Sequence, residues 1–303
     1  MSLTLFLRSF RHRRDWRGNA VRRTGYAIRY TLRSALVASL HAAWLVQVDG
    51  TPALAELAAA DPRLLARPQH PYISRRLSLA QRYAIVAAHY RHVLATFPPT
   101  LFRQVYLDAG LRVGTLQLKD ATELAVELCR PAGQGREGEL CLRLVDEAGR
   151  VLSSVVFSIA DNGRTLLLGC LQGACAELGR DAVRELTKQS YGLRPKNLLL
   201  SMLLAWAGWV GATRVRGVAN VAHPFAGRGD KIKADYDRFW LDCQGVLSND
   251  GFFDLPAREP LRSEAEVESK HRSAFRKREA LRAQACALLL AALDHAHQLA
   301  RAA

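Results

Sequence analysis

The stretch from Leu140 to Leu171 constrains the fold more than any other part of the chain. Apolar residues alternate over Leu140–Val145, and β-branched and aromatic residues fill Val151–Ile159; both patterns are typical of β-strands. Asp161-Asn162-Gly163 predicts a hairpin with a type I′ turn, because Asn-Gly accepts the positive φ angles of that turn. The nearly all-apolar Thr165–Leu171 predicts a strand buried on both faces. The sequence therefore predicts a three-stranded antiparallel meander.

A helical crossover is expected after the meander. The apolar segment Lys196–Val210, with Gly211 as its stop, predicts a buried helix, and Thr213–Asn220 predicts another strand. A strand, a helix and a strand in this order imply a parallel pair. A shorter helix is expected before Lys196–Val210; it runs from Asp181, its N-cap, to Ser190. We therefore expect an α+β protein in which a helical N-terminal part precedes a mixed, mostly antiparallel sheet with crossover helices.

Both ends of the chain are predicted to be helical. Helical periodicity predicts an amphipathic helix over Ser34–Val48 and another over Leu79–Ala95, the second capped by Ser78. The first is expected to pack on the core; the alternative is that, with Arg29 and Arg33 beside it, it lies on an anionic membrane. It is shorter than the roughly 20 residues that span a bilayer. A last long helix is expected over Glu264–Leu299. These patterns divide the chain into a basic helical region (1–104), a mixed core (105–260) and a basic C-terminal helix (261–303).

The charge of the chain predicts an anionic partner. The formal net charge is +15, and nine arginines stand against one acid, Asp15, in residues 1–33. A second basic cluster spans Lys270–Arg278. Such clusters suit phosphates, an anionic membrane surface or nucleic acid. Phe275 is the one aromatic residue in the second cluster, which disfavours base stacking and hence nucleic acid. An arginine-rich genome is the alternative explanation.

The cysteines and histidines predict neither a disulfide framework nor a metal site. Six cysteines are scattered without a Cys-x-x-Cys pair, which favours reduced thiols in the cytoplasm. His89 and His92 lie three apart in a predicted helix; without a third nearby ligand they are expected to be surface histidines. No cleavable signal or transmembrane segment is expected. The expected location is the cytoplasm, and the positive charge adds the option of peripheral binding at the inner membrane.

The order of the predicted elements resembles the GCN5-related N-acetyltransferase fold. In that fold the loop after the last meander strand binds the pyrophosphate of acyl-CoA on backbone N–H groups at a helix N-terminus. The resemblance implies that Gln172, Gly173 and Ala174 contact acyl-CoA. The motif departs from the fold's Gln/Arg-x-x-Gly-x-Gly/Ala pattern, because Gly173 directly follows Gln172 and Cys175 stands where the first glycine belongs. The alternative is that the glycine only shapes a turn.

Four separated blocks also resemble the VirK/YbjX family of bacterial proteins. In chain order they are Leu168–Gly173, Tyr191–Lys196, Asp235–Trp240 and Ser269–Arg278. The resemblance covers most of the chain. It implies a protein of unknown biochemical activity that is linked in some pathogens to virulence, envelope integrity and stress response. It implies no catalytic residues.

Four polar residues in the C-terminal half are candidate ligand contacts or catalytic groups. Arg194 and Lys196 flank the proline that begins a predicted helix, where they would clamp an anion or simply cap the helix. Asn220 and His223 follow the crossover strand, where sites of α/β proteins open. We assign Asn220 to ligand binding and His223 to general-base catalysis, although a histidine before Pro224 is more often structural.

Asp235 and Tyr236 complete the candidate catalytic residues, on the hypothesis that they point into the cleft; the alternative is that Asp235 belongs to an exposed helix face. Two functions from different classes remain open. The first is an acyltransferase-like enzyme that uses acyl-CoA. The second is a non-catalytic basic adaptor that binds an anionic membrane surface or a partner protein, and less readily DNA. The sequence does not decide between them.

Overall fold

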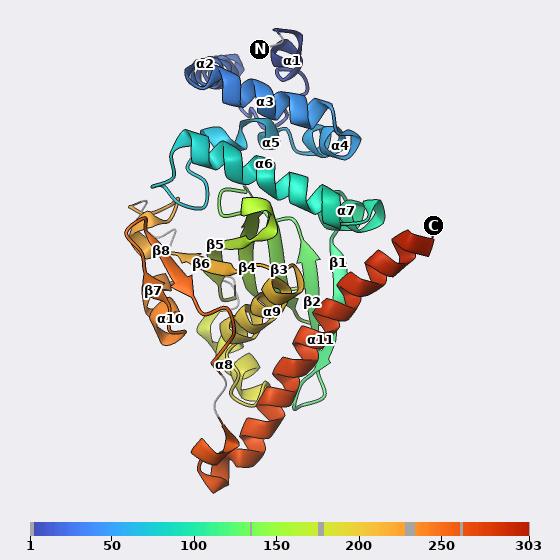
Figure 1. Ribbon diagram of the computed structural model, residues 1–303, viewed down its shortest axis with the longest axis vertical. Coiled ribbons are helices and arrows are strands. Elements are labelled where there is room, and N and C mark those ends of the chain that lie inside the picture. Colours follow the sequence, from blue (N-terminus) through green and yellow to red (C-terminus); the bar gives the residue numbers. More distant parts are fainter. Residues whose placement is uncertain (1–2, 134, 175–178, 228–233, 261–262, 303) are drawn as a thin grey trace.

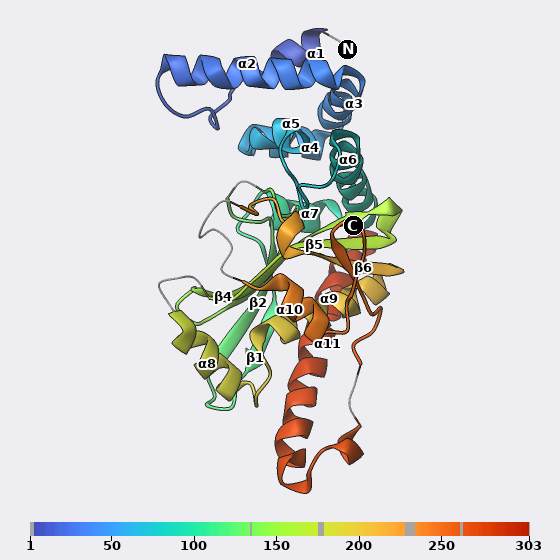
Figure 2. The same cartoon turned by 90° about the vertical axis from the view of Figure 1, so that its left-hand side faces the viewer.

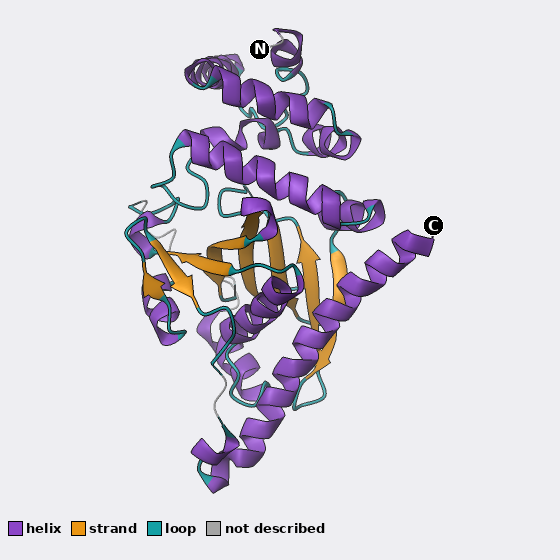
Figure 3. Cartoon of the chain, in the orientation of Figure 1, coloured by secondary structure: helices purple, strands orange, loops and turns teal. Residues whose placement is uncertain are grey.

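The computed structural model describes residues 3–133, 135–174, 179–227, 234–260 and 263–302. A stack of helices lies at one end of the molecule and a twisted sheet forms the centre, with two long helices across one face (Figure 1). Seen from the side, α1 and α2 form the outermost layer, and α6 and α7 lie closest to the sheet (Figure 2). The predicted α+β class is confirmed (Figure 3).

The helical stack contains seven α-helices and a 3₁₀ turn within residues 3–106: α1 (Leu3–Arg8), α2 (Ala20–Leu36), α3 (Ala38–Asp49), α4 (Pro52–Ala60), α5 (Arg63–Ala66), the turn Arg67–Gln69, α6 (Leu79–Thr96) and α7 (Pro99–Tyr106). The helix predicted behind Ser78 is confirmed as α6. Ser78 accepts the backbone N–H of Gln81, and the Gln81 side chain accepts the N–H of Ser78, which forms a capping box.

The single helix predicted over Ser34–Val48 is wrong. The chain breaks at Val37, whose backbone (φ −133°, ψ 43°) lies outside the helical region. Two helices therefore meet there, and they have different environments: Trp44 and Val48 of α3 are buried, whereas Leu36 at the end of α2 is 77% exposed. None of the described helices is both long and apolar enough to cross a membrane.

The sheet has eight strands among the described residues: β1 (Leu111–Gln117), β2 (Glu123–Cys129), β3 (Leu140–Val145), β4 (Val151–Ala160), β5 (Thr165–Gln172), β6 (Arg214–Val218), β7 (Val246–Leu247) and β8 (Phe252–Leu255). Their order is β1-β2-β3-β4-β5-β6-β8-β7, and β5–β6 is the parallel pair. The predicted meander and its parallel neighbour are confirmed. The meander begins two strands earlier than predicted, because β1 and β2 also pair antiparallel.

The predicted hairpin between β4 and β5 is confirmed, but its turn differs. Ala160 pairs with Thr165, which leaves a four-residue loop in place of the two-residue type I′ turn. Asp161, Asn162 and Gly163 all have positive φ, of 51°, 54° and 92°. Asn and Asp tolerate this left-handed region better than other side chains, and glycine has no steric penalty there.

The crossover consists of α8 (Gly179–Gln189) and α9 (Pro195–Trp209). Helix α9 is buried almost all round, because it lies between the sheet and the C-terminal helix α11 (Arg272–Ala302). The single helix predicted over Glu264–Leu299 is wrong at its start. Ser263 caps a short turn (Glu264–Glu266) instead, and α11 begins only at Arg272. The division into three regions stays a prediction.

The expectation that His89 is a surface histidine is wrong. His89 on α6 is fully buried against β4. One ring nitrogen lies 2.7 Å from the Tyr106 hydroxyl and the other accepts the backbone N–H of Ile159 at 3.1 Å. Burial lowers the pKa of His89 to about 3, so the ring is neutral. Two internal partners make burial of this polar ring tolerable.

Candidate functional site

The parallel pair of the sheet ends halfway along β5. The pairing with β6 runs from Thr165–Arg214 to Leu168–Gly217, whereas β5 itself continues to Gln172. Beyond Gly217, β6 continues for one residue, Val218, which pairs with Phe252 of β8. The two strands therefore separate beyond Leu168 and Gly217, before the loop Gln172–Ala174 that the sequence singled out for a ligand. Sites of α/β proteins form at this edge of the sheet.

The loop before β3 crosses β5 at this point. A methyl group built on Gly169 would lie 1.9 Å from the carbonyl oxygen of Glu137, so the backbone of the loop rests directly on the strand. Gly169 is required here for close approach and not for an unusual φ angle. The crossing carries the Glu137 side chain toward the end of β6, where its Oε1 lies 3.1 Å from Nε2 of His223.

His223 is held by contacts at both ring nitrogens. Its Nδ1 accepts the backbone N–H of Phe225 at 3.2 Å, which places the proton of the neutral ring on Nε2, facing Glu137. Nε2 forms no hydrogen bond to Glu137, although the two groups lie within salt-bridge distance. His223 is 1% exposed. The predicted general base therefore has no free, unprotonated nitrogen in this arrangement.

Tyr236 lies beside His223 at the start of α10 (Tyr236–Asp242). The two rings stack with centroids 5.4 Å apart, and the Tyr236 hydroxyl donates to Sγ of Cys170 on β5 at 3.6 Å. Burial raises the pKa of both the Tyr236 hydroxyl and the Cys170 thiol, so both keep their protons at neutral pH. Cys170 is consequently not an activated nucleophile.

Asn220 and Asp235 join the end of β6 to the start of α10. The Asn220 side chain donates to Asp235 at 2.9 Å and accepts the backbone N–H of Tyr236 at 2.8 Å. Asp235 also caps α10 by accepting the N–H of Arg238. These hydrogen bonds lower the pKa of Asp235. The structure thus gives both residues a positioning task that the sequence did not predict.

A cavity of about 520 Å³ opens beside this junction, between α8, the start of α9 and α10. Its lining includes Gly173, Arg194, Lys196 and Asp235, all of which were singled out from the sequence. Two further arginines, Arg184 and Arg238, also line it. The remaining lining side chains are mainly apolar or small: Ser153, Val183, Thr187, Pro195 and Phe239, with Asp242 at the α10 end.

The cavity is positively charged and adjoins the buried residues. Arg194 is the N-cap residue of α9, so its cationic side chain lies at the N-terminal end of that helix and lines the cavity. Lys196 lies 5.8 Å from the centre of the Phe239 ring. Burial lowers the pKa of Lys196, while Cys170 and Asp235 oppose this effect. The dipole of α9 adds a further partial positive charge.

The remaining predicted ligand residues lie outside the cavity lining. The Gln172 side chain is exposed, and its backbone carbonyl accepts a hydrogen bond from Ser153. Ala174 and Asn220 do not line the cavity either, and Cys175 falls outside the described residues. Glu137 was missed, because the glycine-rich stretch around it predicted only a turn. Its acidic charge in a loop between two strands was the available signal.

Comparison with known proteins gives a family and no activity. Residues 19–287 match the family described as "Protein of unknown function (DUF535)". The uncharacterized protein YbjX of Escherichia coli is 27% identical over 284 residues, which are 91% of this chain and 86% of YbjX. An uncharacterized protein of Haemophilus influenzae is 27% identical over 128 residues, 42% of this chain and 43% of its own.

Among solved structures, a cAMP-binding acyltransferase from Mycobacterium smegmatis aligns with 75% of this chain and 65% of its own, at 11% identity and a TM-score of 0.30. The family assignment rests on the sequence matches alone. They run along nearly the whole chain and agree with the four blocks that predicted the VirK/YbjX family. The chain belongs to the DUF535 family.

Proposed function

We propose that this protein is an acyltransferase-like enzyme that binds a CoA thioester in the cavity between α8, the start of α9 and α10. The observation that carries the proposal is the basic cavity beside the point where β5 and β6 part. In the N-acetyltransferase fold that the sequence resembles, the phosphates of acyl-CoA lie after the corresponding strand. In this chain α8 stands between β5 and α9, which departs from that fold. The N-terminal end of α9, and not that of α8, therefore faces the cavity.

The cavity lining fits the charge of such a ligand. Arg194 and Lys196 would bind the phosphates, and Val183 and Phe239 offer apolar contact for the rest of the chain. A CoA thioester supplies an activated acyl group. Glu137, whose side chain is 22% exposed, would accept the proton of the attacking nucleophile, with the Nε2–H of His223 beside it to stabilise the carboxylate.

Replacing Lys196 with alanine is expected to weaken binding of acetyl-CoA and longer acyl-CoAs about tenfold, because a charge-assisted contact to phosphate is lost. Arg194→Ala is expected to act similarly. Isothermal titration calorimetry on the full chain measures both. Lys188→Ala is the matched control, since Lys188 lies on α8 outside the cavity and is 69% exposed. Gln172→Ala should also leave binding unchanged. The absence of binding by every donor, or equal weakening by Lys188→Ala, contradicts the proposal.

A second candidate function is attachment to an anionic membrane through α2. Val21, Ile28, Leu32 and Leu36 are all more than half exposed, and their spacing places them on one face of this 17-residue helix. Arginines flank the face. An exposed apolar stripe beside arginines is the pattern of a helix that lies in a membrane interface, and it would agree with the envelope link that the family resemblance implies.

Replacing Leu32 with aspartate tests this second function. The change is expected to reduce co-sedimentation with vesicles that contain phosphatidylglycerol several-fold, because it places a charge in the apolar stripe. Thr31→Asp, on the neighbouring exposed position, introduces the same charge outside the stripe. Membrane attachment through α2 is excluded if both variants bind the vesicles as the unchanged protein does.

A further inference from the structure

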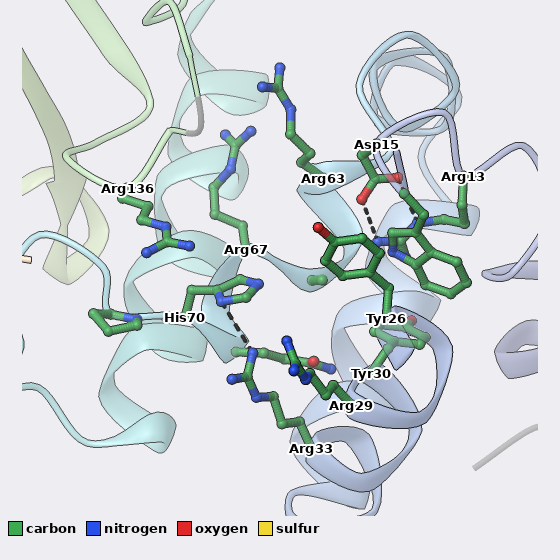
Figure 4. A pocket seen from close by; sticks show the side chains of 14 residues that line it. Arg13, Asp15, Tyr26, Arg29, Tyr30, Arg33, Arg63, Arg67, His70 and Arg136 are labelled. Atoms are coloured by element: carbon green, nitrogen blue, oxygen red, sulfur yellow. Dashed lines mark hydrogen bonds and ion pairs between the residues drawn. The ribbon is translucent and has the colours of Figure 1, made fainter. Parts of the chain in front are cut away.

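A second basic cavity lies at the other end of the molecule, between the helical stack and the loop before β3. Its volume is about 380 Å³. Six arginines from four separate segments line it: Arg13, Arg29, Arg33, Arg63, Arg67 and Arg136. Figure 4 shows the side chains of α2, of α5 with the following turn, and of the loop before β3 arranged around the same space. Asp15 is the one acid in the lining.

Three of these arginines, Arg13, Arg63 and Arg67, bind carboxylates of the described residues. Arg13 binds Asp15 through two hydrogen bonds. Arg63 binds Asp61 in the same two-pronged way. These contacts neutralise two cations, and they also fix the positions of the guanidinium groups in the cavity wall. Preformed, immobilised arginine forks are suited to bind phosphate oxygens.

Arg29 and Arg33 have no carboxylate partner in the described parts of the chain. They lie four residues apart on α2 and so project from the same side of the helix. Arg33 donates to Nδ1 of His70 at 3.2 Å. Burial, together with the charges of Arg136 and Arg33, lowers the pKa of His70 to about 4. His70 is therefore neutral at pH 7 and compensates none of the positive charge.

Arg67 provides an unsatisfied donor at the base of the cavity. Its side chain is 8% exposed and binds both Glu139 and Asp61 through its terminal nitrogens. Its Nε is buried and has no hydrogen-bond partner in the described residues. The backbone of Gly135 lies against the guanidinium, because a methyl group there would be 2.6 Å from Cζ of Arg67. A buried donor without an acceptor costs free energy unless a ligand completes it.

We propose that this cavity is a binding site for a phosphate-bearing anion with two or more negative charges. Arg29 and Arg33 would bind phosphate oxygens from the α2 side, and Nε of Arg67 would donate from the base. Tyr26 and Trp16 also line the cavity and offer aromatic contact for the group attached to the phosphate. The site is independent of the proposed acyl-CoA cavity, since the two share no lining residue.

The test uses the full chain at constant ionic strength, so that general screening of exposed charges stays the same. Calorimetric titrations with inorganic pyrophosphate and with glycerol 3-phosphate measure soluble anions. Binding to phosphatidylcholine vesicles with and without phosphatidic acid measures a lipid headgroup. We expect Arg29→Gln with Arg33→Gln to weaken the bound probe at least about tenfold. Binding of soluble probes alone identifies a soluble phosphate as the ligand, and binding of phosphatidic acid alone identifies a headgroup.

The matched control is Arg22→Gln with Arg23→Gln, which removes the same charge from the same helix at exposed positions outside the cavity. This pair is expected to change the affinity by no more than about twofold, as a screened surface effect. Equal weakening by both pairs would show that general surface charge binds the probe and would overturn the proposal. So would the absence of binding by pyrophosphate, glycerol 3-phosphate and phosphatidic acid alike.

Discussion

Replacing Glu139 with glutamine is expected to lower the free energy of unfolding by about 3–5 kcal/mol, the usual result when one partner of a buried ion pair is removed. Glu139 is fully buried at the start of β3, where it pairs with Arg67 and accepts the Tyr90 hydroxyl at 2.6 Å. Burial raises the pKa of Glu139, and Arg67 opposes this. Glutamine keeps the shape but leaves Arg67 with Asp61 alone.

The matched control for this prediction is Glu127→Gln. Glu127 pairs with Arg143 at 2.8 Å across β2 and β3, and the two side chains are 23% and 29% exposed. The same chemical change there should cost about 0–1 kcal/mol, because water compensates the loss. Urea unfolding curves compare the two variants. Equal losses would mean that the Arg67–Glu139 pair contributes no more than a surface pair.

Replacing Gly169 with alanine is expected to lower the free energy of unfolding by about 1–3 kcal/mol, the usual cost of adding a methyl group to a filled core. The added carbon would meet the Glu137 carbonyl oxygen, which belongs to backbone and cannot rotate away. The loop before β3 must therefore move off β5. Glu137 should then lose its contact with His223, so that the same substitution also disturbs the proposed proton acceptor.

Gly208→Ala supplies the opposite result as a control. Gly208 lies within α9, and no atom stands within 4 Å of a methyl group built there. Alanine should stabilise the protein by about 0.5–1 kcal/mol, since glycine is the poorer helix former. The close crossing at Gly169 is disproved if Gly169→Ala is as stable as the unchanged protein in the same urea unfolding measurement.

The sequence predicted the sheet well because local patterns encode it. Alternation over Leu140–Val145 and the Asn-Gly pair of the next hairpin depend on neighbouring residues only, so they can be read along the chain. The break at Val37 was not readable, because apolar residues continue at helical spacing on both sides of it. The exposure of Leu36 depends on which face of α2 meets other helices, and spacing alone does not fix that.

The candidate site was predicted in part for the same reason. Gly173, Arg194 and Lys196 lie close to elements whose order could be read, and the structure brings them into one cavity. Glu137 could not be found, since its position depends on the crossing of a loop over a distant glycine. For the second basic cavity, the sequence indicated only the arginine cluster of residues 1–33, which supplies Arg13, Arg29 and Arg33. Arg67 and Arg136 meet there only after the helical stack has docked on the sheet.

The position of α11 has a consequence for synthesis of the protein. This helix is synthesised after both β1 and α9, yet it packs on them and contributes Leu289 and Leu293, which are fully buried. A ribosome adds about 5–20 residues per second. The apolar side of α9 therefore stays exposed for roughly ten seconds, until α11 has been synthesised and packs on it. Nascent chains are open to association during this interval, and a stop codon before α11 would make the exposure permanent.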